Sequence, residues 1–160
     1  MATGDVNGDG FADIIAGTGK GSSVRIFDGQ DPSVVLDSFR AFPRVYDRGI
    51  SVAGGDVNGD GLDDVIVGAA KASNLVRIFL AGEEGRAAEF AAYGGPLRGV
   101  NVGAVDINSD GIADIITSQG RGGDSKVRIY KGNSVLNDAP KAPIKFNAFG
   151  PEFSGGVFVG

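Results

Sequence analysis

Residues 55–68 read Gly-Asp-Val-Asn-Gly-Asp-Gly-Leu-Asp-Asp-Val-Ile-Val-Gly, and the chain of 160 residues contains this stretch three times. The other copies span 4–17 and 105–118. Their first aspartates, Asp5, Asp56 and Asp106, lie 51 and 50 residues apart. Self-similarity at a fixed period indicates a repeat protein, in which each copy folds as one unit of supersecondary structure.

Three further segments recur with the same spacing. They are a Val-Arg-Ile-aromatic segment (24–27, 76–79, 127–130), an aromatic-x-Ala-aromatic segment (39–42, 90–93, 146–149) and a Gly-x-x-Val segment (49–53, 99–103, 156–160). These runs are rich in β-branched and aromatic residues and are bounded by Gly, Pro, Asn and Asp, while no helical period persists. We therefore expect four short antiparallel strands per repeat. Short apolar runs such as Val65-Ile66-Val67 suit strands that are buried on both faces.

Four strands in about 50 residues are typical of a β-propeller blade. The predicted fold is all-β, a single domain with blades over about 1–54, 55–104 and 105–160. The first repeat starts at its Asp-rich loop and is expected to lack the strand that precedes the other two loops. Residues 156–160 are expected to be such a strand and to complement the first repeat. The repeated Arg25, Arg77 and Arg128 are expected to pack their stems between blades rather than form a ligand ring.

The composition excludes several kinds of chemistry. With no Cys and no His there is no disulfide, no thiolate or His-based catalysis and no typical zinc site, so a metal must bind oxygen ligands. The formal net charge of −5 disfavours nucleic acid as a partner. No apolar run is long enough to predict a membrane span. The 28 glycines favour many turns and short strands over long helices.

The repeated Asp-x-Asn-x-Asp-Gly-x-x-Asp loop predicts calcium binding. In a calcium loop the side chains at positions 1, 3 and 5 and the carbonyl at position 7 are ligands, and Gly at position 6 supplies the bend. The aspartate at position 9 closes the set. The candidate ligands, for three Ca²⁺ sites per chain, are Asp5, Asn7, Asp9, Phe11 and Asp13; Asp56, Asn58, Asp60, Leu62 and Asp64; and Asp106, Asn108, Asp110, Ile112 and Asp114.

Two alternatives share parts of this pattern. EF-hands and dockerins place a closing carboxylate at position 12, where this chain has Ala16, Val67 and Thr117, and continue as a helix. Both are therefore disfavoured. The loops could also be turns without metal, since Asn-Gly and Asp-Gly favour turns. Three copies in phase favour calcium, because clustered carboxylates without a cation are unfavourable.

The loop motif, the Val-Arg-Ile-aromatic strand and the aromatic-x-Ala-aromatic segment together resemble the FG-GAP repeats of integrin-α-type β-propellers, particularly bacterial ones. The resemblance covers essentially the whole chain. It implies a calcium-stabilised, usually extracellular or cell-surface propeller used for adhesion or for recognising proteins or glycans. The third loop departs from the pattern, with Ser109 and Val105 in place of glycines, but it keeps every side-chain ligand type.

Three blades are too few for a ring, since propellers typically have about four to eight. We expect a homodimer that forms a six-bladed ring; a piece of a longer array is the alternative. The expected function is a non-catalytic calcium-binding module for scaffolding, adhesion or protein recognition. A lectin is one alternative and a hydrolase another, the latter disfavoured because most clustered carboxylates belong to the loops. The end opposite these loops is expected to be basic and to meet an anionic or polar partner, glycan or acidic protein.

Overall fold

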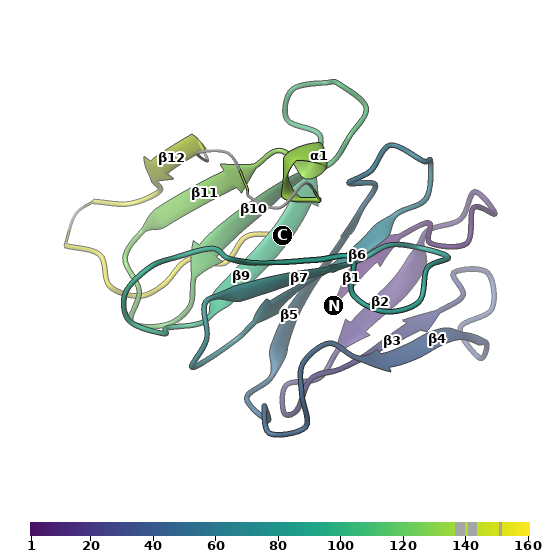
Figure 1. Ribbon diagram of the computed structural model, residues 1–160, viewed down its shortest axis with the longest axis horizontal. Helices are drawn as coiled ribbons and strands as arrows, with labels where there is room; N and C mark the ends of the chain where they lie inside the picture. Colours follow the sequence, from purple (N-terminus) through teal and green to yellow (C-terminus); the bar gives the residue numbers. More distant parts are fainter. Residues whose placement is uncertain (137–139, 141–143, 151) are drawn as a thin grey trace.

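The computed structural model describes residues 1–136, 140, 144–150 and 152–160. It consists of three four-stranded antiparallel sheets, each in chain order, that lie side by side like blades (Figure 1). The first sheet holds β1 (Ala2–Gly4), β2 (Asp13–Gly17), β3 (Ser23–Phe27) and β4 (Val35–Arg40). The second holds β5 (Ile50–Gly55), β6 (Asp64–Ala69), β7 (Leu75–Phe79) and β8 (Ala88–Ala91). The third holds β9 (Val100–Val105), β10 (Asp114–Gln119), β11 (Lys126–Tyr130) and β12 (Ile144–Asn147). The predicted three repeats of four antiparallel strands are confirmed.

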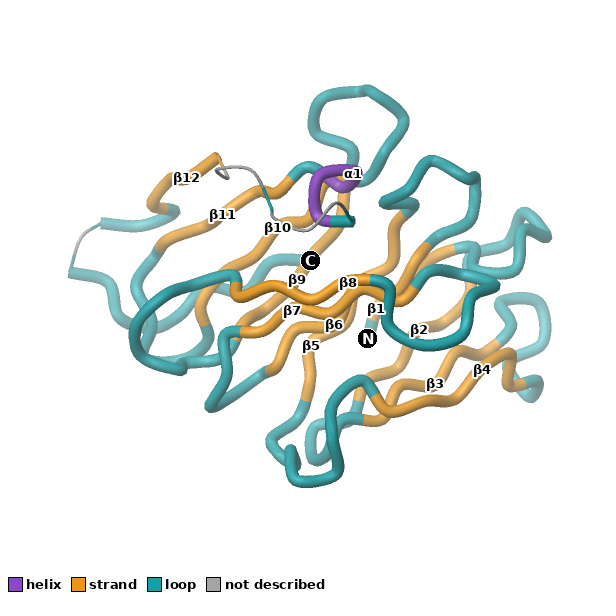
Figure 2. Tube along the Cα trace, in the orientation of Figure 1, coloured by secondary structure: helices purple, strands orange, loops and turns teal. Residues whose placement is uncertain are grey.

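The inner strands bring neighbouring sheets together, because β5 contacts both β1 and β9. The connections gather at the two ends of the sheets (Figure 2). One turn of helix, α1 (Gly132–Val135), lies in the connection after β11. No helix in the described part of the chain has the length and apolar character needed to cross a membrane.

The core consists of two clusters between neighbouring sheets, and β6 contributes to both. Val65 and Val67 pack in the cluster shared with the first sheet, whereas Ile66 packs in the cluster shared with the third. All six residues of β6 are buried. Successive side chains of a strand point to opposite faces of its sheet. A strand whose sheet is packed between two other sheets therefore needs apolar residues at consecutive positions. This explains the continuous Val-Ile-Val run.

Two of the three repeated arginines connect one sheet to the previous one. The Arg77 guanidinium lies 4.6 Å from the centre of the Phe42 ring and donates a hydrogen bond of 2.6 Å to the Ala41 carbonyl. Arg128 repeats both contacts with Tyr93, at 4.5 Å, and with the Ala92 carbonyl, at 2.6 Å. The prediction that the repeated arginines pack between blades is therefore confirmed for Arg77 and Arg128 but not for Arg25. Arg25, at the same position of the first sheet, is exposed.

The prediction that the first repeat lacks its inner strand is wrong. β1 pairs with β2 from Ala2 opposite Ile15 to Gly4 opposite Asp13. It has three residues where β5 and β9 have six. Its brevity hid it, since three residues carry no recognisable alternation. β1 leaves Ala16 and Gly17 of β2 without an inner partner strand among the described residues.

Residues 156–160, expected to be a strand, have no strand assignment in the structure. They nevertheless lie along the third sheet. The Val157 N–H donates to the Gln119 carbonyl at 3.1 Å, and the Val157 carbonyl accepts from the side chains of Asn101 and Ser118. Gly160 approaches Gly103 of β9. The segment thus lies beside β9 where the next inner strand of a propeller would lie.

Candidate metal centre

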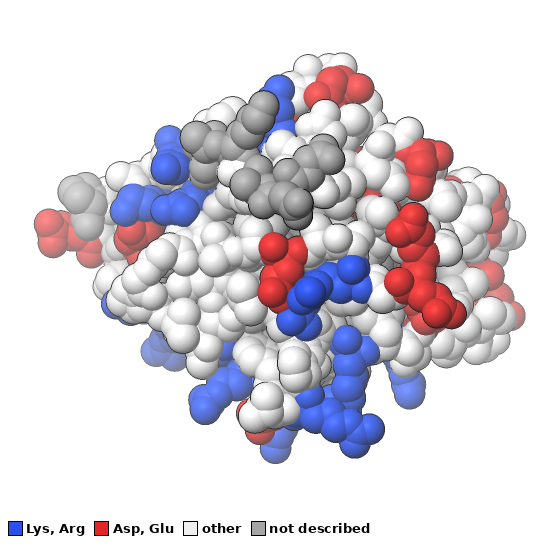
Figure 3. Space-filling view, viewed as in Figure 1, with Lys and Arg blue, Asp and Glu red and all other residues white. Residues whose placement is uncertain are grey.

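The three Asp-rich loops join the first and second strands of their sheets, so they lie at the same end of the molecule. Each loop begins after β1, β5 or β9 and ends where β2, β6 or β10 begins. Acidic side chains gather on this side of the molecule in the space-filling view (Figure 3). Antiparallel pairing explains the placement, because equivalent hairpins of adjacent blades turn at the same end.

The loops share one backbone conformation. Each has two left-handed residues, at positions 4 and 6: Gly8 and Gly10 (φ 76° and 88°), Gly59 and Gly61 (80° and 91°), and Ser109 and Gly111 (61° and 84°). Glycine adopts such angles without steric cost, whereas a side chain at position 4 costs about 1 kcal/mol. The replacement of Gly by Ser109 in the third loop therefore leaves the turn intact at a modest cost in stability.

The aspartate at position 1 organises each loop through backbone N–H groups. In the first loop, Asp5 Oδ1 accepts from Gly8 N–H at 2.8 Å and Oδ2 accepts from Gly10 N–H at 2.9 Å. Asp56 makes the same bonds to Gly59 and Gly61, at 2.6 and 2.8 Å. Asp106 accepts from Gly111 at 2.9 Å, and this bond is the first cause that holds the Asp106 pKa below its ordinary value. The position 1 carboxylates thus accept backbone N–H groups in a turn that suits a cation.

The aspartate at position 9 is buried and joins two loops of its own sheet. Asp13 Oδ2 accepts from Val6 N–H at 3.0 Å, and its Oδ1 accepts from Gly29 N–H at 2.9 Å. Asp64 does the same with Val57 and Ala81, at 3.0 and 2.9 Å. Asp13 and Asp64 are fully buried and Asp114 is 4% exposed. Burial raises the pKa of Asp64 to about 6, so a nearby cation would favour its ionised form.

Positions 3 and 5 lie on the exposed side of the loop. Asn7 Nδ2 is 3.2 Å from Asp9 Oδ2, and the corresponding atoms of Asn58 and Asp60 are 2.8 Å apart. The N–H groups at position 7, in Phe11, Leu62 and Ile112, donate to the carboxylate at position 5. For Asp9 this bond, with a second from Gln30, lowers the carboxyl pKa.

The donor set fits calcium in its chemistry. Every predicted ligand offers oxygen, which is what this hard cation takes, and a carboxylate oxygen that accepts one N–H keeps a lone pair for a metal. In the conformation of the structure, the described residues form no group of three or more carboxylates close enough to hold an ion. The acidic side chains at positions 1, 5 and 9 of the first loop accept backbone N–H groups instead.

Sequence reasoning missed a contact that links the loops of neighbouring blades. Asp63, at position 8 of the second loop, accepts from the Asp5 N–H at 2.8 Å and donates its own N–H to the Asp5 carbonyl at 2.8 Å. The backbone bond recurs between the second and third loops, where the Ala113 N–H donates to the Asp56 carbonyl at 2.7 Å. The available signal was the extra carboxylate at Asp63, where the other two repeats have alanine. The position 1 ligand is thereby fixed to the next blade.

Comparison with protein families agrees with this repeat geometry. The chain matches the model of the FG-GAP-like repeat over residues 5–67 and again over residues 56–117. Each match begins at the first aspartate of one loop and continues beyond the last aspartate of the next, so a matched unit includes two successive loops. The two matches together cover more than half of the chain, and the protein belongs to the FG-GAP-like repeat family.

Proposed function

We propose that the protein is a non-catalytic, calcium-binding β-propeller module for scaffolding and for extracellular adhesion or protein recognition. The observation that carries this proposal is the identical bend of three loops with the same oxygen donors at positions 1, 3, 5, 7 and 9. Membership of the FG-GAP-like repeat family supports a recognition role. The loop carboxylates bond backbone N–H groups, which supports a structural rather than a catalytic use.

Calcium would be held by the loop side chains and the position 7 carbonyl, one ion per loop. The ion would supply positive charge to the loop carboxylates, beside the point where the Asp5 backbone bonds Asp63 of the next blade. Calcium would thus stiffen the end of each sheet.

Removal of one exposed ligand tests this role. We expect Asp60→Ala to lower the number of bound calcium ions by one, because Asp60 is a position 5 donor. In chelator the variant should unfold within about 1 kcal/mol of the wild type, since its carboxylate is exposed. Calorimetric calcium titration and urea unfolding measure the two quantities. Undiminished calcium uptake would contradict the assignment of this loop.

We propose further that two copies form a six-bladed ring. Each internal junction joins an arginine of one sheet to an Ala-aromatic pair of the previous sheet. A third such junction has its two halves at opposite sides of the chain. Its arginine is Arg25, which is exposed on the first sheet. Its Ala-aromatic pair is Ala148 and Phe149 after the third sheet, and Phe149 is 53% exposed. A second copy placed as the next blade would bring Arg25 onto Phe149.

A second complementarity involves the inner strands. Residues 156–159 occupy the same place in the repeat as residues 49–52. In the second sheet, residues 49–52 lead directly into residues 53–55 of β5, which are the counterpart of β1. In a ring of two copies, this segment would pass beside Ala16 and Gly17 of the partner's β2. Their inner edge is unpaired among the described strands. Strand addition of this kind supplies main-chain hydrogen bonds, and the contact closes because twofold symmetry repeats it.

We place recognition at the end opposite the loops, where Lys and Arg gather along the lower edge of Figure 3. This basic end comprises Lys20, Arg44, Arg48, Lys71, Arg98 and Arg121, all exposed. It suits an anionic or polar partner such as an acidic protein surface or a glycan, because loops on a rigid scaffold commonly carry binding.

Charge reversal tests the basic end. We expect the triple change Arg44→Glu, Arg48→Glu and Arg98→Glu to lower binding to an anionic glycan or protein array at least about tenfold. The fold should remain intact because these side chains are exposed. Reversal of Arg86, Lys131 and Lys145, three exposed cations elsewhere, is the matched control. Equal array signals for the wild type and the triple variant would contradict this surface.

A further inference from the structure

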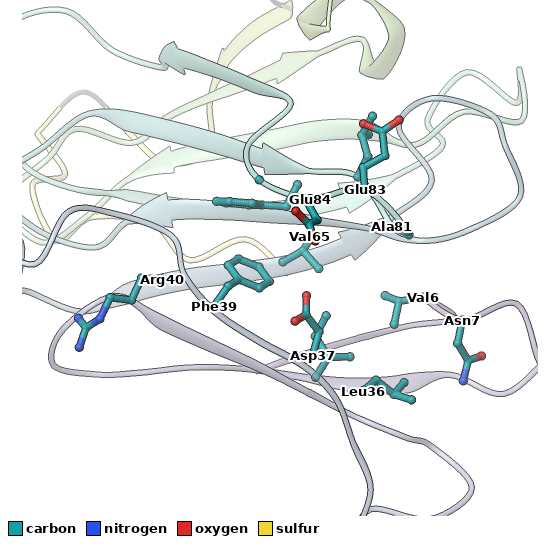
Figure 4. Close-up of a pocket in the computed structure, with 15 residues that line it drawn as sticks. Val6, Asn7, Leu36, Asp37, Phe39, Arg40, Val65, Ala81, Glu83 and Glu84 are labelled. Atoms are coloured by element: carbon teal, nitrogen blue, oxygen red, sulfur yellow. The ribbon is translucent and has the colours of Figure 1, made fainter.

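A cavity of about 570 Å³ opens between the outer strand of the first sheet and the second sheet, away from the Arg-aromatic junction. Its lining includes the apolar side chains of Val6, Phe39, Val65 and Phe79. The Phe39 and Phe79 rings join the two sheets with their centres 4.5 Å apart. The connection between β7 and β8 forms the other wall. Figure 4 shows Phe39 and Asp37 projecting from β4 into the space beside that connection.

The equivalent crevice between the second and third sheets is filled by the chain itself. There Phe90 and Tyr130 take the places of Phe39 and Phe79, with ring centres 4.7 Å apart. Helix α1 packs against β8 and places Val135, 4% exposed, and Leu136 on this cluster. The apolar crevice is therefore a surface that an aliphatic residue on a short segment can cover.

The first crevice stays open because of the length of one connection. Residues 80–87 join β7 to β8, whereas residues 131–143 join β11 to β12 and include α1. The shorter connection turns through left-handed Gly82 and Gly85 (φ 72° and 84°). Within the described chain it contains no helix and no counterpart of Val135.

The two crevices differ in charge as well. Asp37 lies opposite Ile26 on β3, the register position that Ala88 takes opposite Ile78 in the filled crevice. Glu83 and Glu84 add two exposed carboxylates from the connection, and Arg40 is the one basic residue among the lining residues. The open crevice thus has an apolar floor and an acidic rim, which complements a segment with an aliphatic residue beside a cation.

We infer that this crevice binds a short segment of a partner protein that carries an aliphatic residue within one helical turn of a lysine or arginine. The aliphatic side chain covers Phe39 and Phe79, as Val135 covers Phe90 and Tyr130. The cation lies against Asp37 and Glu84. The inference rests on the recognition role proposed above and names the chemistry of a partner at a surface separate from the loops and from the basic end.

The chain itself supplies the probe, an acetylated and amidated peptide of residues 131–136, Lys-Gly-Asn-Ser-Val-Leu. Titrated into ¹⁵N-labelled protein, it should give saturable shifts centred on Val6, Phe39 and Phe79. Replacing its Val and Leu by Ser should weaken binding at least about tenfold, since burial of these side chains is lost. The double variant Asp37→Lys and Glu84→Lys should weaken binding by about tenfold. A peptide with Glu in place of Lys should restore binding to that variant.

The Asp47→Lys variant is the control, since Asp47 is exposed on another connection. It should bind the peptide as the wild type does. Absence of saturable shifts, or equal affinity for the lysine and glutamate peptides in every variant, would overturn the inference. If the peptide fails to bind to a protein that still takes up calcium, this inference alone fails. If the peptide binds but calcium does not, the proposed metal role fails and the crevice stands.

Discussion

Asp13→Ala is expected to lower the free energy of unfolding by about 3 kcal/mol in chelator, because it leaves two N–H groups inside the fold without their acceptor. Asp13 is fully buried and accepts from Val6 and Gly29, which belong to two different connections. Each orphaned donor costs about 1–3 kcal/mol. Urea unfolding followed by circular dichroism measures the change.

Asp9→Ala is the matched control, since Asp9 belongs to the same loop but is exposed. In chelator its effect should stay below about 1 kcal/mol. With calcium present, both variants should lose the stabilisation that the first loop contributes. If Asp13→Ala changed stability no more than Asp9→Ala in chelator, the structural role of position 9 would be wrong.

Arg25→Glu is expected to raise the dimer dissociation constant by about 100-fold, since it replaces a cation over an aromatic ring by an anion at the proposed junction between copies. The internal junctions show the contact that is lost: Arg77 lies over Phe42 and donates to the Ala41 carbonyl. Because Arg25 is exposed within one chain, the stability of the separated protomer should not change. Sedimentation equilibrium measures the dissociation constant.

Arg40→Glu makes the same charge reversal on an exposed residue of β4 that faces the second sheet, away from the proposed junction, and should leave the dimer intact. Phe149→Ala, on the other side of the proposed junction, should weaken the dimer as Arg25→Glu does. A wild-type protein that stays a monomer at every concentration would contradict the ring of two copies. It would favour the alternative that these blades belong to a longer array.

The repeat largely determined what could be predicted of the fold. In-phase loops, strands and aromatic segments gave three four-stranded sheets, and consecutive apolar residues such as Val65-Ile66-Val67 indicated burial on both faces. Strand β1 was not predicted, because its three residues are too few to show an alternation of apolar and polar side chains. The strand expected at 156–160 is not assigned, although the segment lies along β9, since among the described strands it has no next sheet to complete.

The candidate site was predicted as a set of residue types but not as a network. The spacing identified the oxygen donors, yet it could not show that Asp13 and Asp64 are tied to a second connection, because that contact depends on how the chain returns from β3 or β7. It also could not show Asp63 bonded to Asp5, a contact between blades. The open crevice arises from unequal connection lengths, whose consequence appears only when two junctions are compared in space.

The predicted calcium ligands account for much of the acidic charge of the protein. The three loops hold nine of the 20 acidic residues at positions 1, 5 and 9. Three bound divalent ions would change the formal charge from −5 to +1. The calcium-loaded protein would then present a basic end without a strongly acidic background, which favours an anionic partner at that end.

Calorimetric titration of the metal-free wild-type protein with calcium tests the central claim most directly. We expect three bound ions per chain with dissociation constants of about 10⁻⁴ to 10⁻³ M, the range of extracellular modules. Magnesium should compete weakly, because the flexible oxygen donors suit the larger ion. Titration heats equal to those of calcium injected into buffer, with no bound ion, would contradict it.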